Sequence, residues 1–160
     1  MQTTPESEPI GFAPHEIDTA ASTRAARLKW VVVVNDSLPP GRALNAAVCV
    51  SAATVSGVRG LMGPPTLDAD GMEHPGLPWI GCTVLVADDA TLRTLRRKAE
   101  AHEGTFVADM PAVAQEIRVY DEYVAAITGA APDEVQYLAV SLVGPKNRIA
   151  KLVDGLPLMP

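Results

Sequence analysis

The run Leu28–Val34, LKWVVVV, restricts the fold more than any other part of this 160-residue sequence. A continuous β-branched run of this kind is typical of a strand that is buried on both faces. Turn residues close the run between Asn35 and Gly41, and the chain from Arg42 to about Val58 is rich in small side chains that suit a helix packed closely on a sheet. A strand, a tight loop and a helix in this order predict the opening of an α/β layered domain.

The same alternation continues along the chain. Further strands are predicted over Ile80–Ala87, Thr105–Ala108 and Val135–Val143, and helices from Asp88 or Asp89 to about His102, from Ala112 to about Thr128, and from Gly144 to about Gly155. The predicted fold class is α/β. Residues 28–160 are expected to form one three-layer α-β-α domain around a four-stranded sheet, mixed or parallel, with a mixed sheet as the specific prediction. We expect Leu28–Val34 to lie in the centre of that sheet.

Two segments fall outside this pattern. Residues 1–22 are rich in Pro, Glu, Ser and Thr, so residues 1–27 are predicted to be a flexible N-terminal arm, either mobile or loosely docked. Residues 63–78 predict a loop or a hairpin with its turn at Asp70-Gly71. The acidic residues around His74 match no metal-ligand motif, so a hairpin tip is the preferred interpretation there.

The composition argues against two classes of partner. Hydrophobic residues make up 48% of the chain and charged residues 20%, as in ordinary soluble globular proteins. The formal net charge of −6 makes a nucleic-acid partner unexpected, because such proteins usually present a basic surface. No basic and apolar secretory signal opens the chain, and no apolar run approaches the roughly 20 residues of a membrane span. We therefore expect a cytoplasmic protein without a membrane partner.

The cysteines and the apolar ending lead to three further expectations. Cys49 and Cys82 lie in apolar segments without a CxxC motif or a His/Cys cluster. We therefore expect two buried free thiols, no metal site and no other cofactor. The uncharged ending Leu156–Pro160, LPLMP, and the last strand predict a homodimer, because apolar surface is costly to leave in water.

Motifs at both ends of the predicted domain resemble a known family. Lys29–Asp36 (KWVVVVND), the Gly-containing loop and Ala46–Ala53 (AAVCVSAA) resemble the K-x-V-x-V-V strand, G-K-G-K loop and A-A-Q-C-x-H-A-A helix of type II peptidyl-tRNA hydrolases. The ending Leu142–Leu158 is similar to their I-G-P … I-D-K-V-T-G-H-L-K-L. The details resemble more closely a related family known as domain of unknown function 2000, which shares Asn45-Ala-Ala and a D-x-D-G … H-P-G segment, here Asp68–Gly76. The resemblance implies a peptidyl-tRNA hydrolase II-like fold.

The resemblance also indicates which hydrolytic positions have changed. Arg42, at the first loop lysine, and Asp109, at the aspartate after the third strand, keep a charge. The inserted helix predicted from Ala112 replaces a G-x-T hairpin of the family. The other polar positions hold different residues: Leu44 for the lysine usually credited with catalysis, Val48 for the helix glutamine, Ser51 for the helix histidine, and Leu138 or Ala139 for the threonine that opens the last strand.

These changes lead to two hypotheses about function. Ester hydrolysis needs a group that activates water and donors that hold the developing oxyanion, and losing one donor costs about two to three orders of magnitude in rate. The first hypothesis is therefore a protein that lacks peptidyl-tRNA hydrolase activity and binds a small anionic ligand. The alternative is an enzyme, either a peptidyl-tRNA hydrolase or a related ester or amide hydrolase.

The candidate ligand site lies at the loop that follows the first strand. Backbone N–H groups at a helix N-terminus attract anions, and an arginine can clamp a carboxylate or phosphate bidentately. An aspartate beside them would select a ligand that carries a donor group. The candidate ligand-binding residues are Asp36, Gly41, Arg42, Asn45 and Asp109. A purely structural interpretation also exists, in which Asp36 and Asn45 tie down the backbone of a strand–helix turn.

Overall fold

The structure, a computed structural model, describes residues 9–160. Its elements in chain order are η1 (Pro14–Glu16), β1 (Leu28–Asn35), α1 (Pro40–Gly57), β2 (Thr66–Leu67), β3 (Glu73–His74), β4 (Cys82–Ala87), α2 (Asp89–Glu100), β5 (Phe106–Pro111), η2 (Ala112–Gln115), α3 (Tyr120–Thr128), β6 (Tyr137–Pro145) and α4 (Lys146–Leu152). The predicted alternation of strands and helices is present in this order.

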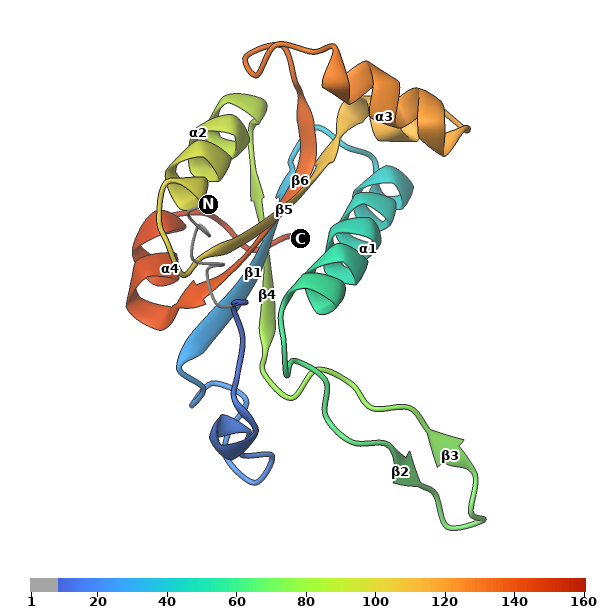
Figure 1. The fold of residues 1–160 in the computed structure, drawn as a ribbon, viewed down its shortest axis with the longest axis vertical. Coiled ribbons are helices and arrows are strands. Elements are labelled where there is room, and N and C mark those ends of the chain that lie inside the picture. The colour runs from blue at the N-terminus through green and yellow to red at the C-terminus, as the bar shows by residue number, and fades with distance from the viewer. Residues whose placement is uncertain (1–8) are drawn as a thin grey trace, which may run out of the picture.

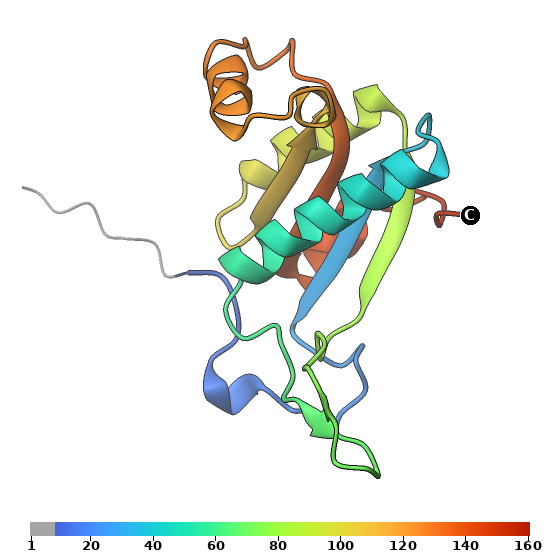
Figure 2. The same cartoon turned by 90° about the vertical axis from the view of Figure 1, so that its right-hand side faces the viewer.

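Four of the strands form one mixed sheet, in the order β4-β1-β6-β5. β1 pairs with β4 in parallel, and both β1 and β5 pair with β6 in antiparallel fashion. Helix α1 lies on one face of the sheet, and α2 and α4 lie on the other (Figures 1 and 2). The α/β fold, the mixed four-stranded sheet and the helical layers are therefore confirmed. β1 is an inner strand, and Val31–Val34 are at most 1% exposed, as its apolar run predicts.

Each face of the sheet has its own core. The face under α1 buries Trp30, Val32 and Val34 against Val50 of α1. The face under α2 and α4 buries the alternate β1 residues Val31 and Val33, and its helices contribute Leu92, Leu95 and Ile149. Successive side chains of a strand point to opposite faces, so one valine run can supply both cores.

A chain of hydrogen bonds crosses the core under α1. The Trp30 Nε1–H donates to Ser141 Oγ at 2.9 Å, and Ser141 Oγ lies 2.7 Å from Thr54 Oγ1. Thr54 Oγ1 donates in turn to the carbonyl of Val50 at 2.7 Å, so Ser141 is the donor between the two hydroxyls. Both hydroxyl residues are fully buried, and the chain satisfies each of these polar groups while it joins β1, β6 and α1.

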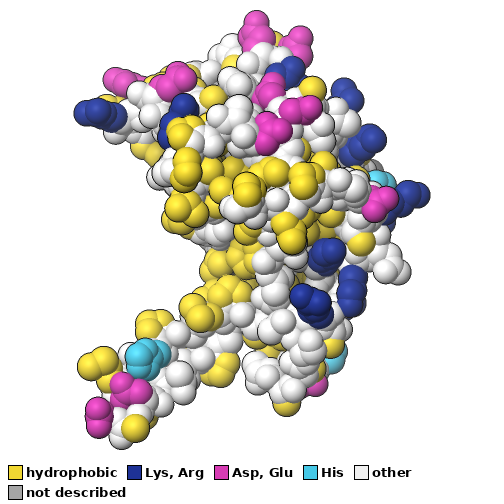
Figure 3. All heavy atoms as spheres, turned by 180° about the vertical axis from the view of Figure 1, so that it is seen from behind, with side chains coloured by type: hydrophobic (Ala, Val, Ile, Leu, Met, Phe, Trp, Pro, Cys, Tyr) yellow, Lys and Arg dark blue, Asp and Glu magenta, His cyan; other side chains and the backbone are white. Residues whose placement is uncertain are grey.

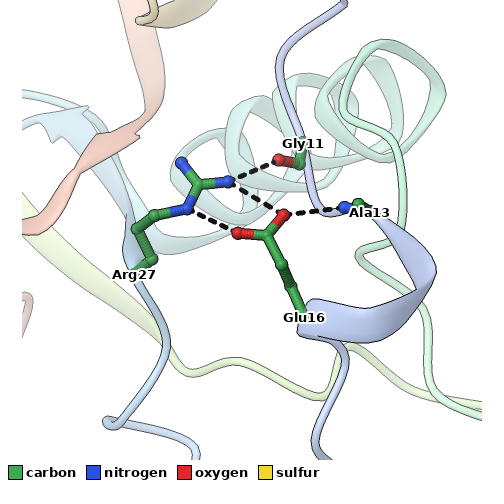
Figure 4. A network of polar contacts seen from close by, with 4 residues as sticks. All are labelled: Gly11, Ala13, Glu16 and Arg27. Carbon is green, nitrogen blue, oxygen red and sulfur yellow. Dashed lines mark hydrogen bonds and ion pairs between the residues drawn. The ribbon is translucent and has the colours of Figure 1, made fainter.

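The N-terminal segment from residue 9 onward packs against the end of the core under α1. Phe12 is 2% exposed, and its ring lies 4.8 Å from that of Trp79. Arg27 donates to both carboxylate oxygens of Glu16 and to the carbonyl of Gly11, and Glu16 also accepts from the Ala13 N–H (Figure 4). Residues 1–8 of the predicted arm lie outside the described residues, and its flexibility stays a prediction.

Residues 62–78 form a hairpin arm that extends away from the body (Figures 1 and 2). β2 pairs with β3, and the turn between them contains Gly71 at φ +83°. The carboxylate of Asp68 accepts the N–H groups of Asp70 and Met72 at 2.9 Å each, which fixes the turn. The predicted hairpin is thus present, with its turn at Asp70-Gly71.

The predicted single helix from Ala112 to Thr128 is wrong. The segment forms the 3-10 turn η2 and then α3, and Val119 between them has extended backbone (φ −108°, ψ 120°). The Ala112 N–H donates to the carbonyl of Gln136, so the start of the segment is tied to the chain that leads into β6. The spacing of apolar residues by threes, fours and sevens continues across Val119, and it carries no information about a hydrogen bond to a distant part of the chain. The spacing alone therefore predicts one uninterrupted helix.

One expectation about apolar groups needs correction: Cys49 and Cys82 are exposed rather than buried. The last strand, β6, lies inside the sheet. The homodimer expected from this strand and the apolar ending stays a prediction. The apolar ending pairs within the chain: Met159 N–H donates to Val84 O, and Val86 N–H donates to Pro157 O, both at 3.0 Å, along the outer edge of β4.

Candidate functional site

The loop after β1 is fixed by Asn35. This residue is 3% exposed, and its Oδ1 accepts the N–H of Ser37 at 3.0 Å and the Ser37 hydroxyl at 2.7 Å. Its Nδ2 donates to the carbonyl of Tyr137. The structural role that the sequence suggested for Asp36 and Asn45 thus belongs to Asn35. A polar residue directly after a doubly buried strand was the available signal.

The first turn of α1 begins earlier than predicted, at Pro40. Its N-cap, Pro39, offers no side-chain acceptor, and in the described part of the chain the N–H groups of Gly41 and Arg42 have no hydrogen-bond acceptor. Gly41 is exposed and faces open space. The N-terminus of this 18-residue helix therefore presents uncapped donors to solvent.

Arg42 and Asn45 meet at a residue that the sequence did not single out. Gln115 of η2 accepts from Arg42 Nε at 2.7 Å through its Oε1. Its Nε2 donates to the Arg42 carbonyl at 3.0 Å and to Asn45 Oδ1 at 3.1 Å. Gln115 lies inside the helix that the sequence predicts over Ala112–Thr128. Its partner Arg42 is 73 positions away, so no neighbouring residues in the sequence indicate this contact. We call these three residues the Arg42 cluster.

A cavity of about 360 Å³ lies between α1, the end of β5 and the η2–α3 segment, near the Arg42 cluster, whose three residues are not among its lining. Cys49, one helical turn after Asn45, and Ala114, beside Gln115, belong to its lining. Its other walls are mostly apolar or aromatic: Met110, Pro111, Ile117, Val119, Tyr120 and Tyr123, with Asp109 and Arg118 as charged residues. We call this cavity the α1–α3 groove.

Asp109 lines this groove, but its carboxylate is bound by Arg96 of α2. Arg96 Nε donates to Asp109 Oδ2 at 2.6 Å. Burial lowers the pKa of Arg96, but the hydrogen bond and charge of Asp109 outweigh it and leave that pKa raised. The next residue, Met110, packs in the core under α1, so Asp109 points toward the α2 side of the sheet. No described hydrogen bond joins Asp109 to Gly41, Arg42 or Asn45.

Asp36 and Tyr123 are two further titratable groups in this part of the structure. Asp36 is exposed in the loop before α1, where its N–H donates to Ala87 O at 3.0 Å, and it is not part of the Arg42 cluster. Tyr123 lines the groove, and burial, together with the charge of Asp109, raises its pKa. At neutral pH its phenol is a neutral hydrogen-bond donor to whatever occupies the groove.

Three of the positions that the resemblance compares with hydrolytic side chains hold apolar residues. Leu44 and Val48 lie on the outer surface of α1 and are 60% and 66% exposed. Leu138 and Ala139 are buried in β6. The outer face of α1 thus carries apolar side chains at both of these positions.

The described residues contain neither a metal-binding cluster nor a membrane-spanning helix. Within residues 9–160 no three His, Cys, Asp or Glu side chains gather in a way that could hold a metal ion. No helix among these residues combines the length and the apolar character needed to cross a membrane.

The likeness to solved structures supports the fold. A protein of unknown function from Agrobacterium tumefaciens strain C58 superposes with a TM-score of 0.78, covering 84% of this chain and 98% of its own, at 16% sequence identity. At that identity the likeness shows a shared fold only. No curated protein matches the chain.

The family comparison covers the whole domain from β1 onward. The model of the family described as "Protein of unknown function (DUF2000)" matches residues 28–160. The match includes both the Arg42 cluster and the hairpin arm, residues 62–78. The chain therefore belongs to the DUF2000 family.

Proposed function

We propose that this protein binds a small ligand bearing a carboxylate or phosphate at the Arg42 cluster and in the adjoining α1–α3 groove, without hydrolysing it. The observation that carries the proposal is the fixed guanidinium of Arg42. Its Nε is occupied by Gln115 Oε1, whereas its two terminal nitrogens have no acceptor among residues 9–160. A guanidinium held in this way can offer its outer edge to an anion in bidentate geometry.

The surroundings of Arg42 favour an organic anion over an inorganic one. The groove volume of about 360 Å³ lies within the range of small-molecule sites, and its aromatic and aliphatic walls suit a ligand with an apolar body. Arg118 adds a second positive charge to the lining, and the negative charge of Asp109 is compensated by Arg96. The uncapped N–H groups of Gly41 and Arg42 add to the positive potential at this end of α1.

Phenyl phosphate is a suitable probe, with inorganic phosphate for comparison, and calorimetric titration measures both. The native protein should bind phenyl phosphate more tightly than inorganic phosphate, because only the former places a ring in the groove. Arg42→Ala should weaken phenyl phosphate binding about 10- to 100-fold, the typical effect of losing hydrogen bonds to a charged group. Gln115→Leu should cause a smaller loss, because the guanidinium remains but is no longer held.

A matched control is Arg97→Ala, which removes an exposed arginine of α2. It should leave binding unchanged, and the folding stability of the Arg42 and Arg97 variants should match that of the native protein within about 0.5 kcal/mol. Equal binding by the native protein and Arg42→Ala, or the same loss in both arginine variants, would refute the proposal.

Peptidyl-tRNA hydrolysis is the second candidate function, and it rests on the motifs of β1 and α1. The apolar, exposed Leu44 and Val48 argue against it, because neither can activate water or hold an oxyanion. We expect no turnover of a model peptidyl-tRNA by the native protein, and weak turnover at most after Leu44→Lys with Val48→Gln. Efficient turnover by the native protein would make the chain an enzyme and displace our first proposal.

A further inference from the structure

The arm, residues 62–78, combines a fixed conformation with exposed apolar side chains. At its root the Gly63 N–H donates to Leu77 O at 2.7 Å, and a side chain at Gly76 would collide with the Gly63 carbonyl. At its tip Asp68 fixes the turn. Yet Leu67, Met72 and Leu77 are 65%, 66% and 77% exposed. A rigid hairpin with bare apolar side chains is typical of an element that docks on another surface.

The charge of the arm is entirely acidic. Residues 62–78 contain Asp68, Asp70 and Glu73, and no lysine or arginine. Figure 3 shows this arm standing away from the body, with acidic and hydrophobic side chains and a histidine near its end. A surface that receives it should therefore be basic.

The body offers such a surface beside the root of the arm. A cavity of about 470 Å³ is lined by Arg24, Lys29 and Lys146, and no acidic residue belongs to its lining. Its remaining walls include Trp30, Cys82 and other uncharged residues. We call this cavity the basic pocket. The view in Figure 3 also shows a group of Lys and Arg side chains on the body.

We propose that two copies of this chain form a dimer in which the arm of each copy docks in the basic pocket of the other. The partner is a second copy because one chain carries both complementary parts, three acidic residues on the arm and three basic residues in the pocket. In a two-fold symmetric dimer each contact occurs twice. The arm and the basic pocket of one copy then both engage those of the other, and no free pair of surfaces is left to add further copies.

The geometry permits this exchange and disfavours docking within one chain. From Met62 to Asp68 the arm rises about 20 Å at the usual extension of a strand, pointing away from the body (Figure 1). The basic pocket includes Gly81, which lies close to the root in sequence, so a fixed arm cannot fold back on it. An arm of this length can reach across an interface to a neighbouring copy.

Sedimentation velocity tests the proposal on the native protein. We expect a dimer at about 50 mM salt that dissociates progressively toward about 500 mM, because salt screens pairs between exposed charges. Asp70→Lys with Glu73→Lys, the arm variant, should weaken the dimer at least tenfold. Arg24→Glu with Lys29→Glu, the pocket variant, should do the same. Asp68 stays unchanged because it fixes the turn.

Combining both pairs of substitutions in one chain should restore the dimer, since the arm is then basic and the pocket acidic. A folding defect could not produce this rescue. Glu116→Lys with Asp133→Lys, two exposed acids elsewhere, changes the net charge as the arm variant does and should leave the dimer intact. Leu67→Ser with Leu77→Ser should weaken it, whereas Leu158→Ser, also exposed, should not.

Several results would overturn the proposal. They are a native protein that is monomeric at low salt, a dimer that tolerates the arm variant, and a combined variant that remains monomeric.

Discussion

The two faces of the sheet differ in where their polar side chains lie, in the core or on the outer surface of the helix. Under α1 the core contains a buried polar chain through Trp30, Ser141 and Thr54, while the outer surface of the helix exposes leucine and valine. Under α2 the core cluster is aliphatic but for Tyr137, and the outer surface carries ion pairs from Arg93 to Asp89 and from Arg96 to Glu100.

The contrast is one reason why we place the proposed site on α1. α2 follows the usual pattern of a solvated helix, with the side chain of Asp88 as its N-cap and charges outside. α1 has no side-chain cap, few charges and a polar tie to the sheet that holds it in one position. A helix held so firmly and left so apolar outside is suited to present a surface, and both the Arg42 cluster and the α1–α3 groove lie along it.

The largest expected effect is on the free energy of unfolding, and it comes from comparing a buried leucine of α2 with an exposed leucine of α1. Leu92 of α2 is fully buried, whereas Leu44 of α1 is 60% exposed. Leu92→Ala should lower the free energy of unfolding by about 2–5 kcal/mol, and Leu44→Ala should change it by less than about 0.5 kcal/mol. Urea denaturation measures both. A comparable loss in the two variants would mean that the outside of α1 is covered and that the contrast is false.

The polar chain under α1 provides the next test. Ser141→Ala leaves the Trp30 Nε1–H buried without an acceptor and removes the donor to Thr54, which should cost about 1–3 kcal/mol. Ser56→Ala, on the exposed side of α1, is the control and should be nearly neutral. If the two serine variants unfold at the same urea concentration, the polar chain does not hold the helix.

Giving α1 the cap that α2 possesses should have a smaller effect of the opposite sign. The backbone of Pro39 (φ −66°, ψ 156°) already suits an N-cap residue, so Pro39→Ser can place a hydroxyl acceptor at the bare N–H groups. The gain of about 0.5–2 kcal/mol is partly offset by losing the rigidity of proline, which leaves a net change of about 1 kcal/mol or less. The same variant should bind phenyl phosphate more weakly, and tighter binding would contradict the proposed site.

The smallest effect concerns the N-terminal segment on the α1 side. Hydrogen bonding to Arg27 lowers the pKa of Glu16 from 4.5 to about 2. A lowered folded-state pKa means that the carboxylate contributes fully above about pH 4.5 and loses this contribution as the pH falls through about 2. Glu16→Gln should therefore differ from the native protein at neutral pH and converge with it near pH 2.

The measurements for Glu16→Gln are tryptophan fluorescence, since Trp79 contacts Phe12, and the rate of proteolysis between residues 9 and 27. The urea midpoint should hardly move, because the ion pair is partly exposed to solvent, with the Arg27 and Glu16 side chains 55% and 27% exposed. A difference from the native protein that persists unchanged at pH 2 would show that this ion pair is not its source.

Most of the fold could be predicted because its signals are local. The valine run identified β1 and its inner position, and the pair Asp88 and Asp89 marked the start of α2, where the structure has Asp88 as the N-cap. The break at Val119 and the joining of Gln115 to Arg42 could not be predicted, since both depend on tertiary contacts. Of the candidate site residues, Arg42 and Asn45 both bond to Gln115, whereas Asp109 is bound by Arg96 on the other side of the sheet.

The position of β6 has a consequence for how the protein folds. The last strand of the chain is inserted between β1, the first of this sheet, and β5, and its Ser141 bonds to a residue 111 positions away. Among the strands of residues 9–160, β5 pairs only with β6, so the β5 wall of the α1–α3 groove lacks its strand partner until β6 arrives. Such long-range pairing is slow, commonly milliseconds to seconds. During synthesis the first turn of α1 must therefore wait until β6 has been made before its contact with Gln115 is held in place.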